Sequence, residues 1–277
     1  MIRAVIAAMS WLVVAAVATD DAGAQQAIPN SPGWQMAYEA DMCVLSRAYA
    51  TKSGEFVFGI RSTLPGVDMV GLQIVTEGMT SRKRERQLAT ISVPGQDQLW
   101  QGEVTLWPAP KLKQTLILGS VPRTLLTPIA AAQEVTIAVA GQEPVTLPIS
   151  AAKQALKALE ACEADFAKTL GIDAAQSMNV KTPAEPAKTV GDWIRFEDYP
   201  KSALQAGVGG TVSILWEVDK QGKIASCRTI KTSGREDLDK AACDALMKRA
   251  RFNRPALDAA GNPVASYGTR QVVWAIP

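Results

Sequence analysis

The sequence predicts an α+β protein with two folded domains. Short alternating apolar runs, separated by Gly and Pro turn signals, extend over much of residues 34–172 and predict an antiparallel β-sandwich or barrel-like domain. A helix with an apolar stripe closes that domain. The end of the chain then has the pattern strand, strand, helix, strand, which predicts a small ββαβ domain over residues 193–277.

The N-terminus has the pattern of an export signal. A positive residue precedes the apolar residues 4–18, and Ala22–Ala24 resembles a cleavage site of small residues. We therefore expect residues 1–24 to be a signal peptide and the mature chain to begin at Gln25. The alternative is a retained membrane anchor, although the apolar run is shorter than the roughly 20 residues that a membrane-spanning helix needs.

In the N-terminal domain, strands are expected where apolar runs lie between turns. The expected strands are residues 42–49, 55–60, 69–76, 88–93, 102–107, 115–118, 134–139 and 145–147. The closing helix should begin with Ser150 as its N-cap, because Ala151, Leu159 and Leu170 follow at helical spacing, and should end at Gly171.

A polar segment, residues 173–192, is expected to link the two domains. Its Thr182–Pro186 stretch contains two prolines and predicts an extended, short connection.

In the C-terminal domain, two strands are expected at residues 211–219 and 223–231, joined by a turn at Gly222. A helix with one apolar face is expected at residues 236–249, and a last strand at 267–276.

Four cysteines are present, Cys43, Cys162, Cys227 and Cys243, and an even number in an exported chain suggests two disulfides. Three pairings are open in principle. Because each expected domain contains two of the cysteines, the pairs Cys43–Cys162 and Cys227–Cys243 are favoured. The spacing contains no C-x-x-C motif, so neither a zinc knuckle nor a thioredoxin-like site is indicated.

The composition argues against several functional classes. A net charge of +2 and the lack of a basic stripe with interleaved aromatics do not indicate a nucleic-acid partner. The chain contains no histidine, which excludes Ser-His-Asp triads and HExxH zinc sites. An S-x-x-K match at Ser150–Lys153 lacks the S-D-N partner of serine β-lactamases. We therefore expect no enzyme, metal or cofactor; an enzyme in the N-terminal domain would need a pocket of perturbed carboxylates.

The order and spacing of small motifs in the C-terminal domain match a known family. These motifs are Tyr199–Pro200, Gly210–Val212, Val218–Asp219, Gly222–Ile224, Thr232–Gly234, Leu238–Asp239, Arg251–Phe252 and Val272–Trp274. Together they resemble the C-terminal domain of the TonB family of periplasmic energy transducers, over about residues 193–277. The match is closest to a branch that carries cysteines like Cys227 and Cys243. The resemblance implies a periplasmic, non-enzymatic domain that holds a short extended peptide of an outer-membrane partner.

By this resemblance, the last strand lies at the edge of the sheet and binds the peptide by β-strand addition. The candidate binding residues are Thr269, Arg270, Gln271, Val272, Val273 and Trp274. The implied partner is an outer-membrane receptor or another envelope protein, in a role linked to TonB-dependent transport. Pairing of two copies through exposed edges would give a homodimer.

The chain also departs from the family's pattern. Energy transducers carry a long Pro-rich spacer where this chain has a folded β domain and a short linker, and the family's intramembrane histidine is absent. The alternative hypothesis is therefore an envelope adaptor or structural protein without energy transduction. Membrane contact, and an inner-membrane location instead of the periplasm, are expected only if the N-terminal segment is retained.

Overall fold

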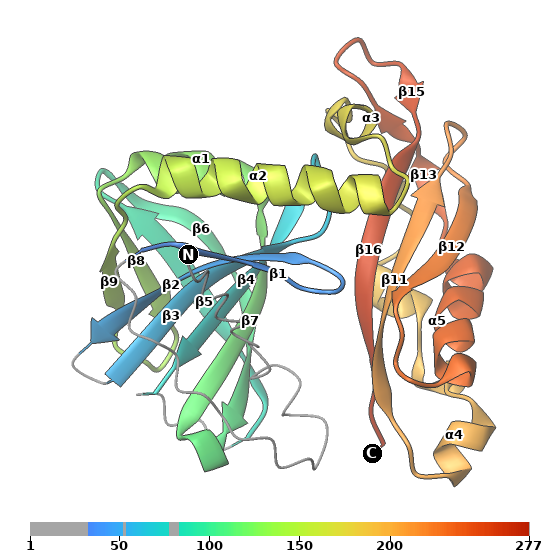
Figure 1. The fold of residues 1–277 in the computed structure, drawn as a ribbon, viewed down its shortest axis with the longest axis horizontal. Coiled ribbons are helices and arrows are strands. Elements are labelled where there is room, and N and C mark those ends of the chain that lie inside the picture. Colours follow the sequence, from blue (N-terminus) through green and yellow to red (C-terminus); the bar gives the residue numbers. More distant parts are fainter. Residues whose placement is uncertain (1–32, 52–53, 78–82, 277) are drawn as a thin grey trace, which may run out of the picture.

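The computed structural model describes residues 33–51, 54–77 and 83–276, which form two lobes side by side (Figure 1). The N-terminal lobe is a curled sheet crossed by the long helix α2. The C-terminal lobe is a small sheet with helix α5 on one face. The predicted signal peptide, residues 1–24, lies outside the described residues. Within the part described, no helix has the length and apolar character to cross a membrane.

The N-terminal lobe is built on one antiparallel sheet of nine strands, in the order β1-β2-β3-β4-β7-β6-β5-β8-β9. The strands are β1 (Gln35–Tyr38), β2 (Cys43–Thr51), β3 (Gly54–Ser62), β4 (Met69–Thr76), β5 (Glu85–Val93), β6 (Gln96–Ala109), β7 (Gln114–Pro122), β8 (Glu134–Val139) and β9 (Val145–Pro148). The sheet is continuous and curled, which fits the barrel-like form and not two stacked sheets. Every expected strand is found in this lobe. The structure also contains β1, which was not expected from the sequence.

Alternation of side chains places the main core inside the curl. Phe56, Phe58 and Ile60 of β3 are at most 3% exposed, as are Leu72 of β4 and Ile117 of β7. Because neighbouring residues along a strand point to opposite faces, the residues between them face outward. The curled sheet therefore has a packed interior and an outer face that is available to the other lobe.

Helix α2 (Ala152–Thr169) crosses one opening of the curl, beside the short helix α1 (Leu126–Ala131) (Figure 1). Its buried residues Leu159 and Cys162 face the core, and Cys162 forms a disulfide with Cys43 at the start of β2. This bond closes a separation of 119 residues. The chain-entropy model gives about 4.7 kcal/mol for a loop of about 100 residues.

The prediction that Ser150 caps α2 is wrong. The helix begins after Ala151, whose φ is +57°, and has no side-chain cap. Ser150 instead accepts hydrogen bonds from the far side of the sheet: its carbonyl from Trp34 Nε1 at 2.8 Å and its Oγ from Arg47 Nη1 at 2.8 Å. These bonds join the β1–β2 end of the sheet to the chain that leaves β9, and so hold the curl together.

The C-terminal lobe contains a three-stranded antiparallel sheet in the order β12-β11-β16. Its elements are α4 (Lys201–Gln205), β11 (Gly210–Val218), β12 (Ile224–Lys231), α5 (Glu236–Arg249), β13 (Phe252–Arg254), β14 (Ala256–Leu257), β15 (Pro263–Val264) and β16 (Ser266–Trp274). The α+β class is as predicted, but the three short strands between α5 and β16 were not. A disulfide between Cys227 of β12 and Cys243 of α5 joins the sheet to the helix that covers it. Both disulfides are the pairings that the distribution of cysteines favoured.

The connecting segment is attached to the C-terminal lobe. It contains α3 (Ala174–Met178) and β10 (Glu185–Pro186), and β10 pairs with β13. Thr182 bridges Leu257, and Glu185 accepts a hydrogen bond from Arg254 Nε at 2.7 Å. The expected extended linker is thus more ordered than its prolines indicate, since its backbone pairs with strands far along the chain.

Candidate functional site

One buried carboxylate contacts all three strands of the C-terminal sheet. Asp41, in the turn between β1 and β2, is 2% exposed. It accepts hydrogen bonds from Ser213 of β11, from Gln271 of β16 at 3.0 Å and from Lys231 of β12 at 3.2 Å. A buried charge is tolerated when it is paired and hydrogen-bonded in this way. The turn therefore fixes the N-terminal lobe against the sheet.

An apolar cluster completes the contact between the lobes. Leu215 of β11 is 3% exposed and packs against Leu64, Ala167 and Ile172 of the N-terminal side. Because Leu215 and Ser213 alternate with the residues that face α5, both lie on the opposite face of the sheet. Helix α5 and the N-terminal lobe therefore cover the two faces of the sheet.

Strand β16 is an edge strand. It pairs with β11 along its whole length, from Ser266 opposite Val218 to Trp274 opposite Gly210, and with no other strand among the described residues. Edge strands carry backbone N–H and C=O groups that can pair with another chain. The two faces of this sheet are covered, so its unpaired backbone groups lie at its two edges, β16 and β12.

The six predicted binding residues lie on this strand but differ in environment. Val272 and Trp274 are 7% and 4% exposed and pack in the core of the lobe, whereas Val273 is 56% exposed. Thr269, Arg270 and Gln271 line a groove between the lobes. The backbone of β16 is thus the element that the six residues share.

The groove has a volume of about 660 Å³, within the ~300–1,000 Å³ of typical ligand sites. One wall is β16. The other is the outer face of the curled sheet, where Arg61 of β3, Gly71 of β4 and Ser120 of β7 line it; Trp193 also lines the groove. The sequence did not indicate the second wall, because it depends on how distant strands of the first lobe pack.

Two hydrogen-bond donors in the groove lack partners. Arg61 Nε and Trp193 Nε1 are buried and have no hydrogen-bond acceptor among the described residues. Burial lowers the pKa of the Arg61 guanidinium, and the nearby Asp41 carboxylate opposes that shift. Arg270, by contrast, donates to the carbonyl of Val190. Both N–H groups are inaccessible, so what the groove presents to a ligand is the positive charge of Arg61 and not these two donors.

The lack of a side chain at position 268 of β16 has a steric explanation. Gly268 lies opposite Trp216 in the register of β11 and β16, and a Cβ atom there would be 2.3 Å from the Trp216 ring. The indole of Trp216 in turn packs edge-on against Trp193, with ring centroids 5.9 Å apart. Gly268 thus allows two tryptophans to pack beside the edge strand.

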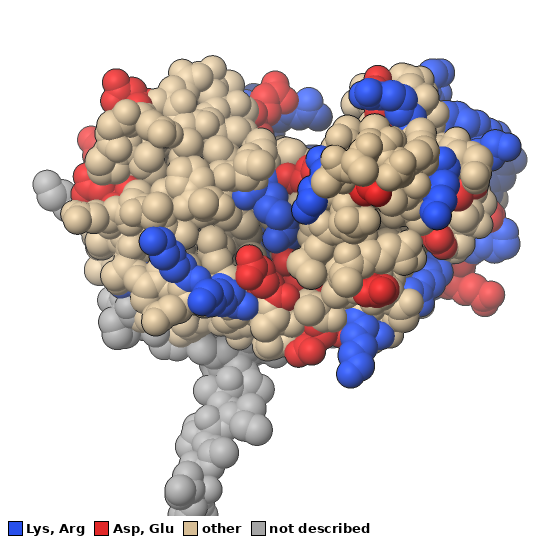
Figure 2. All heavy atoms as spheres, turned by 90° about the horizontal axis from the view of Figure 1, so that it is seen from above, with Lys and Arg blue, Asp and Glu red and all other residues tan. Residues whose placement is uncertain are grey.

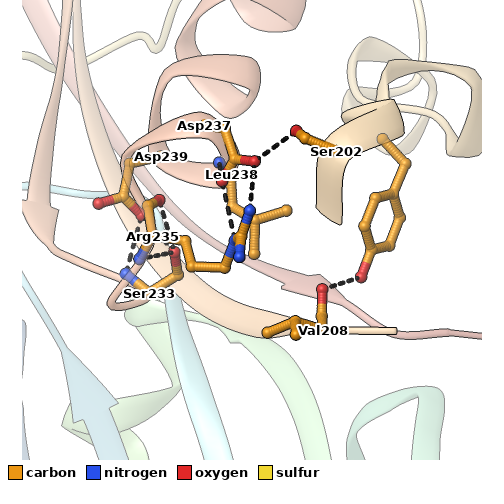
Figure 3. Close-up of polar contacts among 8 residues, drawn as sticks. Ser202, Val208, Ser233, Arg235, Asp237, Leu238 and Asp239 are labelled. Carbon is orange, nitrogen blue, oxygen red and sulfur yellow. Dashed lines mark hydrogen bonds and ion pairs between the residues drawn. The ribbon is translucent and has the colours of Figure 1, made fainter. Parts of the chain in front are cut away.

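A second polar cluster lies at the start of α5 and holds the lobe together (Figure 3). Asp237 accepts hydrogen bonds from Arg235 at 2.7 Å and from Ser202 of α4 at 2.6 Å, and these keep its pKa well below its ordinary value. Asp239 accepts from Ser233 Oγ at 2.6 Å. Carboxylates held ionised by such partners position helices α4 and α5.

No group of metal-binding side chains is found in the part of the chain that the structure describes.

Charge is spread unevenly over the surface. Figure 2 shows Lys and Arg side chains distributed over the C-terminal lobe, while uncharged residues cover much of the N-terminal lobe in this view. Charges of both signs also lie along the boundary between the lobes. This face therefore carries mixed charge and not a continuous basic surface of the kind that binds nucleic acid.

Residues 197–276 match the family model of the Gram-negative bacterial TonB protein C-terminal domain. The C-terminal lobe is a TonB C-terminal family domain. Two curated relatives are "Protein TonB" of Xanthomonas campestris pv. campestris, from strains B100 and ATCC 33913, each 42% identical over 50 residues. The aligned part is 18% of this chain and 22% of each relative, so the chain spans about a fifth of their length. The family match leaves out the nine-stranded lobe.

The two disulfides agree with what is known of the location of TonB family proteins. The TonB family consists of non-enzymatic energy transducers that are periplasmic or anchored in the inner membrane and that interact with outer-membrane receptors. The two disulfides fit a protein exported to an oxidising compartment. The TonB C-terminal domain here has its edge strand facing a groove whose other wall is the N-terminal lobe.

Proposed function

We propose that this chain is a periplasmic TonB-like binding protein that holds an extended peptide of an outer-membrane or other envelope protein by strand addition to β16. The observation that carries this proposal is the unpaired edge of β16, in a TonB C-terminal family domain, along a groove of about 660 Å³. The binding site is the backbone of Thr269–Trp274, and the binding has no catalytic step.

The covered faces of the sheet leave its two edges to a peptide, and the groove lined by Thr269, Arg270 and Gln271 favours the edge at β16 over the edge at β12. An added strand lies about 4.8 Å from β16, and its side chains point alternately to the two faces of the sheet. One set of side chains then points toward the face on which Leu215 lies and which Asp41 covers, and this brings it against the N-terminal lobe. Backbone hydrogen bonds supply affinity, and the contacts of alternate side chains supply selectivity.

A second candidate function is an envelope adaptor without energy transduction. Two observations favour the adaptor. A folded lobe packs directly against the TonB C-terminal domain. The connecting segment pairs with β13 and β14 and does not form an extended spacer. Fractionation of the native envelope separates the two. Transduction requires a chain retained in the inner membrane, whereas an adaptor is compatible with release to the periplasm after cleavage before Gln25.

The binding proposal is tested with displayed random heptapeptides. Peptides selected on the folded chain are resynthesised with alternate backbone nitrogens methylated, which removes hydrogen-bond donors and leaves the side chains intact. Strand addition predicts that methylation in one of the two alternating registers abolishes binding while the other register is tolerated. Equal binding of the parent and both methylated peptides would contradict strand addition. Analytical ultracentrifugation of the chain without peptide shows whether it forms a dimer, in which a second copy would occupy the edge of β16 in place of the peptide.

A further inference from the structure

We propose that Arg61 of the N-terminal lobe selects a carboxylate-bearing side chain, Asp or Glu, in the peptide that adds to β16. This inference rests on the proposed function and deepens it. It assigns a recognition role to a lobe outside the family match, and makes the binding site a composite of both lobes.

The position of Arg61 is set by the fold of the first lobe. Ile60 points into the core with 3% exposure, so the next residue, Arg61, lies on the outer face of β3. It pairs with Gly71 on β4, and a Cβ atom at Gly71 would be 3.2 Å from Arg61 Nε. The absence of a side chain at Gly71 therefore lets the guanidinium lie across β4, where both residues line the groove.

The charge of Arg61 is left without a close counter-ion. Asp41 is the acid near it, but the Asp41 carboxylate already accepts from Ser213, Gln271 and Lys231, and Lys231 supplies the paired cation. Among the described residues Arg61 forms no salt bridge, and its buried Nε has no acceptor. A buried or half-buried cation without a partner is costly, so a ligand that brings an anion is favoured there.

A carboxylate is the ligand group that fits best. The planar guanidinium can donate two parallel hydrogen bonds to the two oxygens of a carboxylate, which adds geometric selectivity to charge attraction. A further acid of the groove is Asp68, and the nearby Arg123 is itself paired with Glu163. A carboxylate is therefore favoured where it lies closer to Arg61 than to Asp68.

The test uses matched peptides that differ only in a carboxylate or an amide at one side chain. A selected heptapeptide is made with Glu or Gln at each position that faces the N-terminal lobe, and affinities are measured by calorimetry for the wild type, Arg61→Gln and Arg61→Lys. We expect the wild type to prefer Glu at one position by about ten- to a hundredfold. Arg61→Gln should bring this ratio close to one while affinity for the Gln peptide stays within about threefold. Arg61→Lys should keep part of the preference, because it retains the charge but not the planar fork.

Two results would overturn the inference. Equal affinity of the wild type for the Glu and Gln peptides would show that no carboxylate is selected. A Glu/Gln affinity ratio that Arg61→Gln leaves unchanged would place the selection elsewhere, and if both peptides bind equally more weakly to this variant, Arg61 only supports the fold. The methylated peptides separate this failure from that of the proposed function, because their loss of binding reports strand addition whatever residue stands at position 61.

Discussion

Asp41 Oδ1 lies 3.2 Å from Lys231 Nζ although the two residues are 190 positions apart in the chain. The contact joins the first turn of the N-terminal lobe to β12 of the TonB C-terminal domain. With Ser213 and Gln271 on the same carboxylate, it sets the distance between the outer face of the curled sheet and β16. The width of the proposed peptide groove therefore depends on this residue.

Replacement of Asp41 should loosen the lobes. Asp41→Ala leaves Ser213, Lys231 and Gln271 without their buried acceptor, and we expect a loss of about 1–3 kcal/mol in the free energy of unfolding, moderated by the 40% exposure of Lys231. Urea denaturation measures the loss. Asp244→Ala is the control, because its pair with Lys240 is exposed and should cost less than about 1 kcal/mol. Equal losses in the two variants would show that Asp41 has no special role.

The two disulfides should differ in their effect on stability. The bond Cys43–Cys162 joins residues 119 apart, whereas Cys227–Cys243 joins residues 16 apart. In the chain-entropy model, paired Cys→Ser replacement costs about 4.7 kcal/mol for a loop of about 100 residues and about 3 kcal/mol for the shorter one. Urea denaturation of the two double variants checks this order. A larger loss from the shorter loop would show that strain or residual structure dominates.

Acid should destabilise the C-terminal lobe through Asp198. Burial acts to raise the pKa of this carboxyl, but hydrogen bonds from Arg249 at 2.6 Å, a hydrogen bond from the Arg195 backbone and the charge of Arg249 together outweigh it, and the folded-state pKa is lowered. The group thus contributes stability above its unfolded pKa of about 3.9, and that stability is lost as pH falls below about 4 toward the lower folded pKa. Asp198→Asn should flatten the fall in unfolding free energy over this range. An unchanged slope between pH 5 and 2 would assign the acid sensitivity to other carboxyls.

Gly268→Ala should disturb the edge strand. The new Cβ atom would meet the Trp216 ring at 2.3 Å, so the ring or the strand must shift, at a cost of about 1–3 kcal/mol. Gly191→Ala is the matched control, since the nearest atom to its Cβ is 3.7 Å away, an ordinary contact. Thermal unfolding and the fluorescence of the tryptophans report both effects. If both variants unfold like the wild type, Trp216 is free to move.

Local patterns predicted most of the elements. The expected ranges 69–76, 134–139 and 236–249 coincide with β4, β8 and α5, because alternation along a strand and an apolar stripe on a helix are encoded by neighbouring residues. The edge position of the last strand was instead expected from the resemblance to the TonB C-terminal domain. These signals are sufficient to find the C-terminal wall of the groove.

The remaining features depend on contacts across the whole chain. Ser150 has the residue type of an N-cap but instead accepts from Arg47, which lies 103 positions away. Arg61 and Asp41 have no local motif, and their roles arise when the outer face of the curled sheet meets β16. Charged residues in a turn, like Asp41, or on an outer strand face, like Arg61, usually contact solvent, so the sequence could not distinguish these two from the rest.

Hydrogen–deuterium exchange of β16 amides, with and without a selected peptide, tests the central claim most directly. Strand addition at the free edge should slow the exchange of alternate amides between Ser266 and Trp274, because in an antiparallel pair only every second residue directs its N–H toward a given neighbour. The other amides already face β11 and should change little. Bound peptide with no added protection in β16, or protection that is confined to another strand, would contradict the account.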